Sequence, residues 1–364
     1  MDKMKRYIDC YIATETCNLR CHYCYITQNK KFNNKIVEFR YSPQEIRKAL
    51  SVPRLGGKCL LNMCAGGETL IAENLIDVVK ELLEEGHYVM IVTNGTLSKR
   101  FEKISKLPKE LLNHLFFKFS FHYLELVRIN MLDEFFKNIE LMKKSGASFT
   151  VEITPSDELE PYIEEIKEIS MKKLGALPHI TIGRKDLGDI PALTEHSFEE
   201  YIKIWQTFDS ELFNYKTKIF GEKRNEFCYA GEWSGYLNLV TGDLMQCYYG
   251  RKVDNIYENI EEPIKFMAIG NNCESPHCYN GHSFLAFGDI PELISPTYND
   301  IRNRVCTDGS EWLTTDMKNF MSSKLIESNS EYDKNEKRQI NKINQKYIKM
   351  KKIRAKIKKI IKRK

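Results

Sequence analysis

TETCNLRCHYCYI, residues 14–26, places Cys17, Cys21 and Cys24 inside eight residues. Tetrahedral zinc and a closed iron–sulfur cluster take four protein ligands, whereas a catalytic centre keeps one metal position open for water or substrate. Three thiols in this spacing therefore indicate a metal centre with one open position. Two alternatives remain beside this interpretation: a small zinc site with His22 as its fourth ligand, or three unrelated buried thiols.

The region from residue 6 to 209 alternates short β-branched and aromatic runs with stretches of helical periodicity. The predicted strands are 6–14, 58–64, 87–93, 115–122, 148–154 and 178–184. The predicted helices are 42–50, 72–86, 97–107, 131–146, 156–175 and 197–208. Six strands that are each followed by a helix predict a parallel sheet with right-handed crossovers, too small to close an eight-stranded barrel. The predicted fold class is α/β, a partial (β/α)6 TIM-like barrel whose working edge is formed by the carboxyl ends of its strands.

The composition of the 364-residue chain, 42% hydrophobic and 29% charged, is that of a globular protein. We find no apolar run long enough to span a bilayer, and the beginning MDKMKRYIDC is too short and too charged for a secretion signal. Eleven cysteines, an odd number, favour metal ligands and buried thiols over a disulfide framework. These features predict a cytoplasmic protein.

The C-x3-C-x2-C spacing, with an aromatic residue before the last cysteine and a predicted strand before the first, resembles the signature of the radical S-adenosylmethionine (SAM) superfamily. The resemblance implies that Cys17, Cys21 and Cys24 are the catalytic ligands of three irons in a [4Fe–4S] cluster, and that SAM chelates the fourth iron. An electron from the cluster would cleave SAM to a 5′-deoxyadenosyl radical, which removes hydrogen from a substrate. A reductant such as flavodoxin or ferredoxin would supply the electron.

The same resemblance assigns further residues to SAM. CAGGETL (64–70) contains the family's Gly-Gly-Glu element, which would receive the SAM ammonium, and a Thr-Asn-Gly turn after the third strand would lie beside SAM. A serine at the end of the fourth strand and an aromatic residue over the cluster complete the set. The predicted cofactor-binding residues are Tyr23, Gly66, Gly67, Glu68, Thr93, Asn94 and Ser120. Ordinary turns, a buried sheet hydroxyl and loop packing are the alternatives for these positions.

After about residue 210 the pattern changes to short strands, glycine turns and further cysteines. Cys228, thirteen residues, Gly242, four residues and Cys247 form a pattern similar to the start of the SPASM and Twitch extensions of radical SAM enzymes. The segments YLNLV and LMQCY around a Thr-Gly-Asp turn predict a β-hairpin. With Cys273 and Cys278, these thiols would bind an auxiliary [4Fe–4S] cluster that passes electrons.

The second cysteine set departs from the longer SPASM pattern, which has seven cysteines, so one Twitch-like cluster is expected. A zinc site is the alternative, and His277 and His282 leave a mixed ligand set open. Three other cysteines, Cys10, Cys59 and Cys64, lie in strand patterns and are expected in the core, whereas Cys306 is not assigned. The predicted domains are 1–210 for the barrel, 211–320 for the auxiliary domain and 321–364 for a tail.

Of all these features, the substrate is the one that the sequence indicates least. Oxidation of an alcohol removes a proton besides a hydrogen atom, and an anionic substrate needs a cation. The candidates for these tasks are His122, Glu152, Arg184, Arg224, Tyr229 and Glu232. Only sixteen residues precede Cys17, so a peptide-recognition domain ahead of the motif would have to be a separate protein. This favours a small molecule, a sugar or glycan precursor that is oxidised. A peptide-modifying (RiPP-type) maturase, an epimerase and a non-catalytic iron–sulfur or zinc scaffold are the alternatives.

The end of the chain, residues 340–364, contains ten lysines, two arginines and no acidic residue. Since the net charge is +5, this +12 segment leaves −7 on the rest of the chain. Isoleucines three or four apart between the basic residues predict a basic amphipathic helix suited to an anionic membrane face or a partner groove. A disordered tail is the alternative. Nucleic acid is not expected as a partner, because the segment has one aromatic residue and no recognised fold around it.

Overall fold

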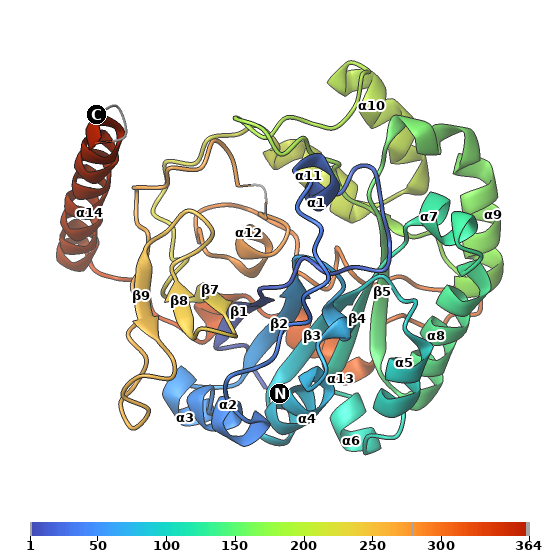
Figure 1. Cartoon of the computed structure of the whole chain (residues 1–364), viewed down its shortest axis with the longest axis horizontal. Helices are drawn as coiled ribbons and strands as arrows, with labels where there is room; N and C mark the ends of the chain where they lie inside the picture. Colours follow the sequence, from blue (N-terminus) through green and yellow to red (C-terminus); the bar gives the residue numbers. More distant parts are fainter. Residues whose placement is uncertain (1, 279, 362–364) are drawn as a thin grey trace.

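A computed structural model describes residues 2–278 and 280–361 (Figure 1). Its centre is one nine-stranded sheet in the order β6-β5-β4-β3-β2-β1-β7-β8-β9. The strands are β1 (Arg6–Ile12), β2 (Cys59–Ala65), β3 (Tyr88–Thr93), β4 (Leu115–Ser120), β5 (Ser148–Ile153), β6 (His179–Ile180), β7 (Ser234–Asn238), β8 (Asp243–Met245) and β9 (Lys252–Asn255). Because β6 and β9 stand at opposite ends of this order, the sheet is open.

The six predicted strands are present, and each is parallel to its neighbour from β1 to β6. This confirms the α/β class and the partial barrel. The sixth strand is shorter than predicted, because the chain after Thr181 pairs with a different segment. Gly183 accepts a hydrogen bond from Leu193, and Arg184 forms an isolated bridge with Ala192.

The crossover helices lie on the outer side of the parallel strands, where Figure 1 shows α4, α5, α8 and α9 in a row around the sheet. The helices and 3-10 turns are α1 (Tyr25–Gln28), α2 (Pro43–Ala49), α3 (Val52–Leu55), η1 (Thr69–Ile71), α4 (Leu75–Glu84), α5 (Ser98–Ile104), α6 (Lys109–Leu112), α7 (Tyr123–Arg128), α8 (Leu132–Ser145), η2 (Asp157–Tyr162), α9 (Ile163–Leu174), α10 (Phe198–Trp205), η3 (Gln206–Phe208), α11 (Glu211–Ile219), α12 (Phe284–Phe287), α13 (Thr315–Met321), η4 (Leu325–Glu327) and α14 (Lys334–Ile361). Local signals set several ends: Ser42 and Ser197 begin α2 and α10 with capping boxes.

Side chains of the strands alternate between two cores, as the period of two requires. One set, which includes Ile8, Leu61 and Phe117, packs in a cluster with the crossover helices. The residue before each of these, Tyr7, Leu60 or Phe116, belongs to a second cluster on the inner face. The inner face of the sheet therefore packs against a different part of the chain from the outer face.

That partner comes from the C-terminal third of the chain. Phe284, Phe287, Tyr298 and Phe320 belong to the inner cluster, and Tyr7 stacks at 4.8 Å from Phe287. Tyr88 stacks at 3.7 Å on Phe320. These side chains fill the inner face near the amino ends of β1–β4, and a cavity lies further toward the carboxyl ends of the strands.

The predicted hairpin is present as β7 and β8, which pair antiparallel through Tyr236 with Met245 and Leu237 with Leu244. Gly242 closes the turn with φ of +81°, a conformation that favours glycine. Strand β7 also pairs parallel with β1. The hairpin therefore continues the barrel sheet. The predicted boundaries after residues 210 and 320 remain predictions, although α11 and Met321 pack with the barrel core.

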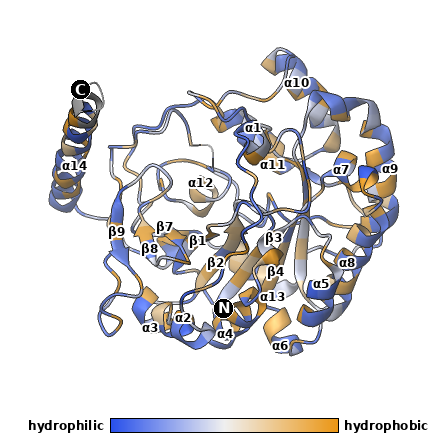
Figure 2. Ribbon diagram, in the orientation of Figure 1, coloured by the Kyte–Doolittle hydropathy of each residue, from blue (hydrophilic) through white to orange (hydrophobic). Residues whose placement is uncertain are grey.

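The basic tail is helical in α14, which contacts the body of the protein through residues between Lys337 and Lys352. Asn344 donates hydrogen bonds to the carbonyls of Ala268 and Ile269, at 2.8 and 3.0 Å, and Gln246 donates to Asn344. Figure 2 shows hydrophobic and hydrophilic residues alternating along α14. Its exposed apolar residues are Ile343, Tyr347, Met350, Ile353 and Ile357. No helix within residues 2–278 and 280–361 is long and apolar enough to cross a membrane.

Asn344→Ala is expected to lower the free energy of unfolding by about 1–3 kcal/mol, because the Ile269 carbonyl loses the Asn344 donor and the Ala268 carbonyl keeps only Gln246 of its two side-chain donors. Urea unfolding would measure the change. Gln345→Ala is the matched control, since Gln345 is exposed on the same helix and should change stability by less than about 0.5 kcal/mol. Equal effects of the two substitutions would show that the amide contact does not hold α14.

Candidate functional site

The cysteine loop follows β1 and lies at the carboxyl ends of the parallel strands. Cys21 is buried, and Cys17 and Cys24 are half-buried. All three line a cavity of about 210 Å³. The predicted residues that line the same cavity are Gly66, Gly67, Glu68, Thr93, Asn94 and Ser120. Residues from the ends of four strands thus meet at one place, as a parallel sheet brings them together.

Gly66 and Gly67 let the loop after β2 lie directly against the cysteine loop. A Cβ on Gly67 would stand 1.9 Å from the carbonyl oxygen of Thr16, and one on Gly66 would stand 2.4 Å from that of Thr14. Two backbone hydrogen bonds join the two loops. The Gly67 N–H donates to the Thr14 carbonyl at 2.8 Å, and the Glu68 N–H donates to the Thr16 carbonyl at 3.0 Å. Only residues without a Cβ fit here.

The carboxylate of Glu68 is buried and joins three segments. One oxygen accepts hydrogen bonds from the Leu70 N–H at 2.9 Å and the Thr93 hydroxyl at 2.7 Å, and the other accepts from the Asn94 N–H at 2.7 Å. Burial raises the pKa of Glu68, which these donors oppose. A carboxylate has about four lone-pair positions. One position therefore remains for the predicted SAM ammonium, whose contact with Glu68 stays a prediction.

The chemistry of the three thiols fits a metal cluster. Burial raises the pKa of Cys17 to about 11 and also raises the pKa values of Cys21 and Cys24. Thiolates here need positive charge, which bound metal supplies. The Leu19 N–H and the Asn94 amide point at the Cys17 sulfur, at 3.4 and 3.8 Å. These donors stabilise a thiolate.

The spacing of ligand atoms bears on the zinc alternative. In a mononuclear tetrahedral site with Zn–S of about 2.3 Å, the sulfurs lie about 3.8 Å apart. Within residues 2–278 and 280–361, the only group of three His, Cys, Asp or Glu ligand atoms within 4.8 Å of one another is Asp157, Glu160 and His196. Both predicted cysteine sets are therefore wider than a preformed zinc site.

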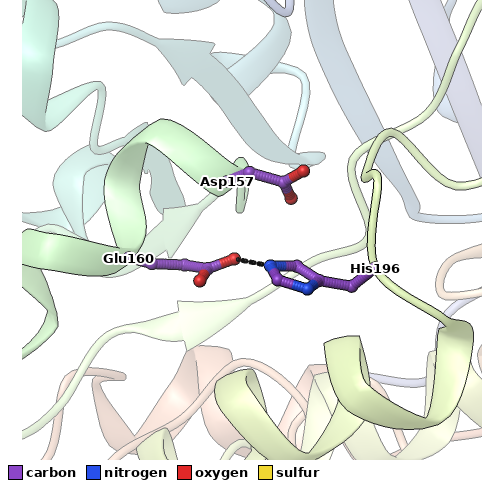
Figure 3. Close-up of side chains that lie close together, drawn as sticks. All are labelled: Asp157, Glu160 and His196. Carbon is purple, nitrogen blue, oxygen red and sulfur yellow. Dashed lines mark hydrogen bonds and ion pairs between the residues drawn. The ribbon is translucent and has the colours of Figure 1, made fainter.

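Asp157, Glu160 and His196 lie together in Figure 3, and their contacts are structural. His196 and Glu160 form an ion pair at 2.8 Å. Asp157 accepts hydrogen bonds from the Thr194 hydroxyl and the Glu195 N–H, both at 2.7 Å. The group fastens the loop before α10 to η2.

A second cavity of about 610 Å³ lies next to the first and occupies the inner face of the barrel. Six residues line both cavities: Cys24, Tyr25, Ala65, Val92, Ser120 and His122. The wall of this larger cavity is polar, although strand residues that face the inside of a barrel are normally apolar. The strand residues that supply this polarity are Asp9, Asn62, Cys64, Lys118 and Glu152. A ligand in this space would therefore meet both the cysteine loop and several charged groups.

Tyr23 and His122 meet at the mouth between the cavities. The Tyr23 hydroxyl and His122 Nδ1 share a hydrogen bond of 2.5 Å. Burial, and then the nearby Lys118, lower the pKa of His122 to about 4. His122 is thus neutral near pH 7. Tyr23 lines the larger cavity and lies next to Cys21, while its predicted contact with adenine stays a prediction.

The second cysteine set is also assembled in the fold. Burial raises the pKa values of Cys228, Cys247 and Cys278, and neighbouring thiols of the same set, including Cys273, add to the effect. All four are half-buried beside the inner core cluster. The fold therefore brings together four residues that are up to fifty positions apart.

Two histidines near this set have other surroundings. His277 stacks against Phe220 at 4.7 Å, and His282 lines the larger cavity. Cys306 is buried and donates to the Leu174 carbonyl at 3.3 Å. Cys10 and Cys59 are core residues, as expected. Cys64 differs from the expectation, since it is half-buried and lines the larger cavity.

Among the substrate candidates, His122, Glu152 and Arg184 line the larger cavity. The other three have structural contacts near the start of α14: Arg224 pairs with Glu226, Tyr229 stacks on Trp233, and Glu232 bonds the Tyr332 hydroxyl. The residues that sequence reasoning missed are Asp9, Asn62, Lys118, Lys216 and Tyr248. Charged residues inside apolar strands, such as Asp9 and Lys118, were a signal that could have found them.

Glu68→Gln is expected to lower the free energy of unfolding by about 1–3 kcal/mol, because its amide cannot accept from all three donors. Glu73→Gln, a change of the same kind on an exposed residue nearby, should have less than about 0.5 kcal/mol effect. Urea unfolding of both variants measures this. If Glu68→Gln is as stable as the control, the three-way contact does not hold the site.

Comparison with known proteins gives one family match. Residues 11–168 match the sequence profile of the Radical SAM superfamily. A curated relative, the GTP 3',8-cyclase of Petrotoga mobilis, is 35% identical over 107 residues. This match covers 28% of the chain and 32% of the cyclase, so the chain spans about a third of that relative.

Two solved structures align with part of this chain. SuiB from Streptococcus suis is 14% identical, with 71% of this chain and 65% of SuiB covered and a TM-score of 0.47. A second structure, anSMEcpe with bound AdoMet, is 16% identical, with 69% of this chain and 78% of anSMEcpe covered and a TM-score of 0.46. The part of the chain that is similar to the Radical SAM superfamily is thus residues 11–168, which contain the end of β1, the cysteine loop and strands β2 to β5.

Proposed function

We propose that the protein is a radical SAM enzyme that cleaves SAM reductively and removes hydrogen from a substrate held in the larger cavity. The observation that carries the proposal is the junction of the two cavities. The smaller one joins the three cysteines to the Gly-Gly-Glu and Thr-Asn-Gly turns, and six residues line both it and the larger cavity. A reactive group generated in the smaller cavity would therefore face a substrate directly.

In this proposal Cys17, Cys21 and Cys24 hold a [4Fe–4S] cluster, and the remaining residues of the smaller cavity orient SAM. The bound cluster and SAM would supply the hydrogen-abstracting radical chemistry. Glu68 keeps the turns after β2 and β3 together through its three hydrogen bonds. Gly66 and Gly67 keep these turns against the cysteine loop.

We further propose an oxidation of a small polar molecule, such as a sugar or glycan precursor. The larger cavity has a volume within the usual range for small-ligand sites, about 300–1,000 Å³, and its wall is rich in hydroxyl and charged groups. His122 is neutral and next to the shared wall, so it could take the proton of an oxidised alcohol. A peptide-modifying maturase or epimerase is the alternative enzyme, and a metal-binding scaffold is the alternative without catalysis.

The four cysteines of the second set suit an auxiliary [4Fe–4S] cluster. Four thiolates would close every iron, which leaves electron transfer as the natural role. Hydrogen abstraction removes one electron with a proton, and an auxiliary cluster would accept the second electron of an oxidation. A reductant of the flavodoxin or ferredoxin class would reduce the first cluster.

Changing Cys17, Cys21 and Cys24 together to alanine is expected to abolish reductive SAM cleavage by anaerobically reconstituted protein. Close to four irons per chain should remain, because the second cysteine set is unchanged. Product analysis for 5′-deoxyadenosine and iron analysis measure the two effects. The controls are Cys59→Ala and Cys306→Ala, which replace buried cysteines that line neither cavity and should leave both values unchanged.

Cleavage of SAM by the triple variant would exclude the proposed role of the loop. Zinc in place of the remaining iron would exclude the auxiliary cluster while leaving the first proposal intact. No SAM cleavage by the unaltered, fully reconstituted protein would favour the scaffold. A product of unchanged oxidation state would favour the epimerase.

We also propose that α14 gives the protein a peripheral contact with an anionic membrane face. Beyond its contacts with the body, the helix exposes Met350, Ile353 and Ile357 between basic residues. Replacing the twelve basic residues of 342–364 with glutamine is expected to remove sedimentation with anionic vesicles, since each contributes roughly 1 kcal/mol near such a surface.

A Lys172→Gln and Lys173→Gln variant is the control for this vesicle test, because it removes exposed charge from α9 only. It should sediment with anionic vesicles as the unaltered protein does, and neither should sediment with neutral vesicles. Absence of binding by the unaltered protein would contradict the membrane proposal.

A further inference from the structure

Lys216 is a buried lysine whose ammonium makes few of the hydrogen bonds that it can donate. It lies on α11 with 5% of its surface exposed and lines the larger cavity. An ammonium has three protons to donate. In the described part of the chain, the only acceptor of a hydrogen bond from Lys216 is the Thr181 hydroxyl. Burial of an ammonium with so few hydrogen-bond acceptors has a large desolvation cost.

Lys324 shows how the same chain satisfies a half-buried lysine elsewhere. Its ammonium donates to four oxygens: the carbonyls of Ala286, Ser295 and Pro296, and the Ser295 hydroxyl. Lys324 faces none of the cavity residues. Lys216 is more deeply buried than Lys324 and yet has fewer acceptors, which indicates that the open positions around its ammonium belong to the cavity.

The nearest carboxylate is already engaged with two other cations. Glu152 pairs with Lys118 at 2.9 Å through one oxygen and with Arg302 at 2.6 Å through the other. Burial disfavours the Glu152 anion, yet these two cations hold its pKa well below the usual value. Three cations, Lys118, Arg302 and Lys216, thus surround one carboxylate, which leaves an excess of positive charge.

Two further observations agree with this excess. Burial, and then Arg184, lower the pKa of Lys216 well below its usual value, as expected for a cation without a neutralising partner. His282, which also lines the cavity, has a buried Nδ1 without a hydrogen-bond partner among the described residues. The residues that carry the unpartnered ring nitrogen and the undersatisfied ammonium thus line the same space.

We infer that this part of the cavity binds an anionic group of the substrate, a carboxylate or a phosphate, with Lys216 as its main cationic partner. The inference rests on the proposed function, in which the larger cavity holds the substrate. An anion at Lys216 would neutralise the excess charge, fill the remaining ammonium bonds and accept from or donate to His282 according to its protonation. Substrate would then be held at one end while another part lies beside Cys24 and Ser120.

The test compares thermal unfolding of the anaerobically reconstituted full chain in chloride, inorganic phosphate and acetate at equal ionic strength. Phosphate, acetate or both should raise the Tm of the unaltered protein by a few degrees. In Lys216→Met this rise should be lost. In chloride alone Lys216→Met should unfold at the same or a higher temperature, because an unpaired buried charge has been removed. A response to phosphate only indicates a phosphorylated substrate, and a response to acetate only indicates a carboxylate.

Two variants complete the experiment. Lys216→Arg keeps the positive charge and should keep the response, which also covers the case in which Lys216→Met does not fold. Lys185→Met is the control, since Lys185 lines the rim of the same cavity but pairs with the exposed Glu195. It should respond to the anions as the unaltered protein does. The same response in Lys216→Met, no response to either anion, or a loss in Lys216→Arg as large as in Lys216→Met would overturn the inference.

The measurement needs neither SAM cleavage nor the true substrate, so it is independent of the proposed function. If the unaltered protein binds anions through Lys216 but does not cleave SAM, the proposed function fails and the anion site stands. If it cleaves SAM but shows no anion response, the inference about the substrate fails and the proposed function stands.

Discussion

The site depends on a close contact between the cysteine loop and the loop after β2. The two backbones approach so closely that no Cβ would fit between them. Gly66 and Gly67 lie against the carbonyls of Thr14 and Thr16, and their backbone hydrogen bonds fix the cysteine loop to the loop after β2. Glu68 then extends this connection to the turn after β3. One short segment therefore sets the positions of both predicted cofactor-binding turns relative to the three cysteines.

The inner face of the barrel shows how the same strands serve stability and function. Toward the amino ends, residues such as Tyr7 and Tyr88 pack in the second hydrophobic cluster. One or two alternations further along, Asp9, Lys118 and Glu152 line a cavity. Buried charges are costly, and here most of them are paired or hydrogen-bonded. Lys216 differs, because within the described residues it has no carboxylate partner and donates only to the Thr181 hydroxyl, and it gives the cavity its excess positive charge.

The C-terminal part of the chain completes the barrel in three ways. Strand β7 extends the sheet beside β1, and residues around Phe287 and Phe320 fill the inner face at the amino ends of the strands. The start of α14 covers the segment that leads to Cys273, through Asn344 and Asn341. These contacts join the predicted auxiliary segment and the tail to the barrel.

The sequence by itself determined the features that depend on local pattern: the six parallel strands, the hairpin around Gly242, the cysteine loop and the turns that the superfamily resemblance assigned to SAM. Each of these features depends on a short segment of the chain, because spacing, periodicity and turn residues are local properties. Only the tertiary structure decided which polar residues share the larger cavity. Asp9, Lys118, Glu152 and Lys216 come from four separate elements, and their proximity depends on strand order, on side-chain direction and on the packing of α11 against β6. Charge balance around Lys216 is a sum over such distant neighbours, which no single segment of the sequence contains.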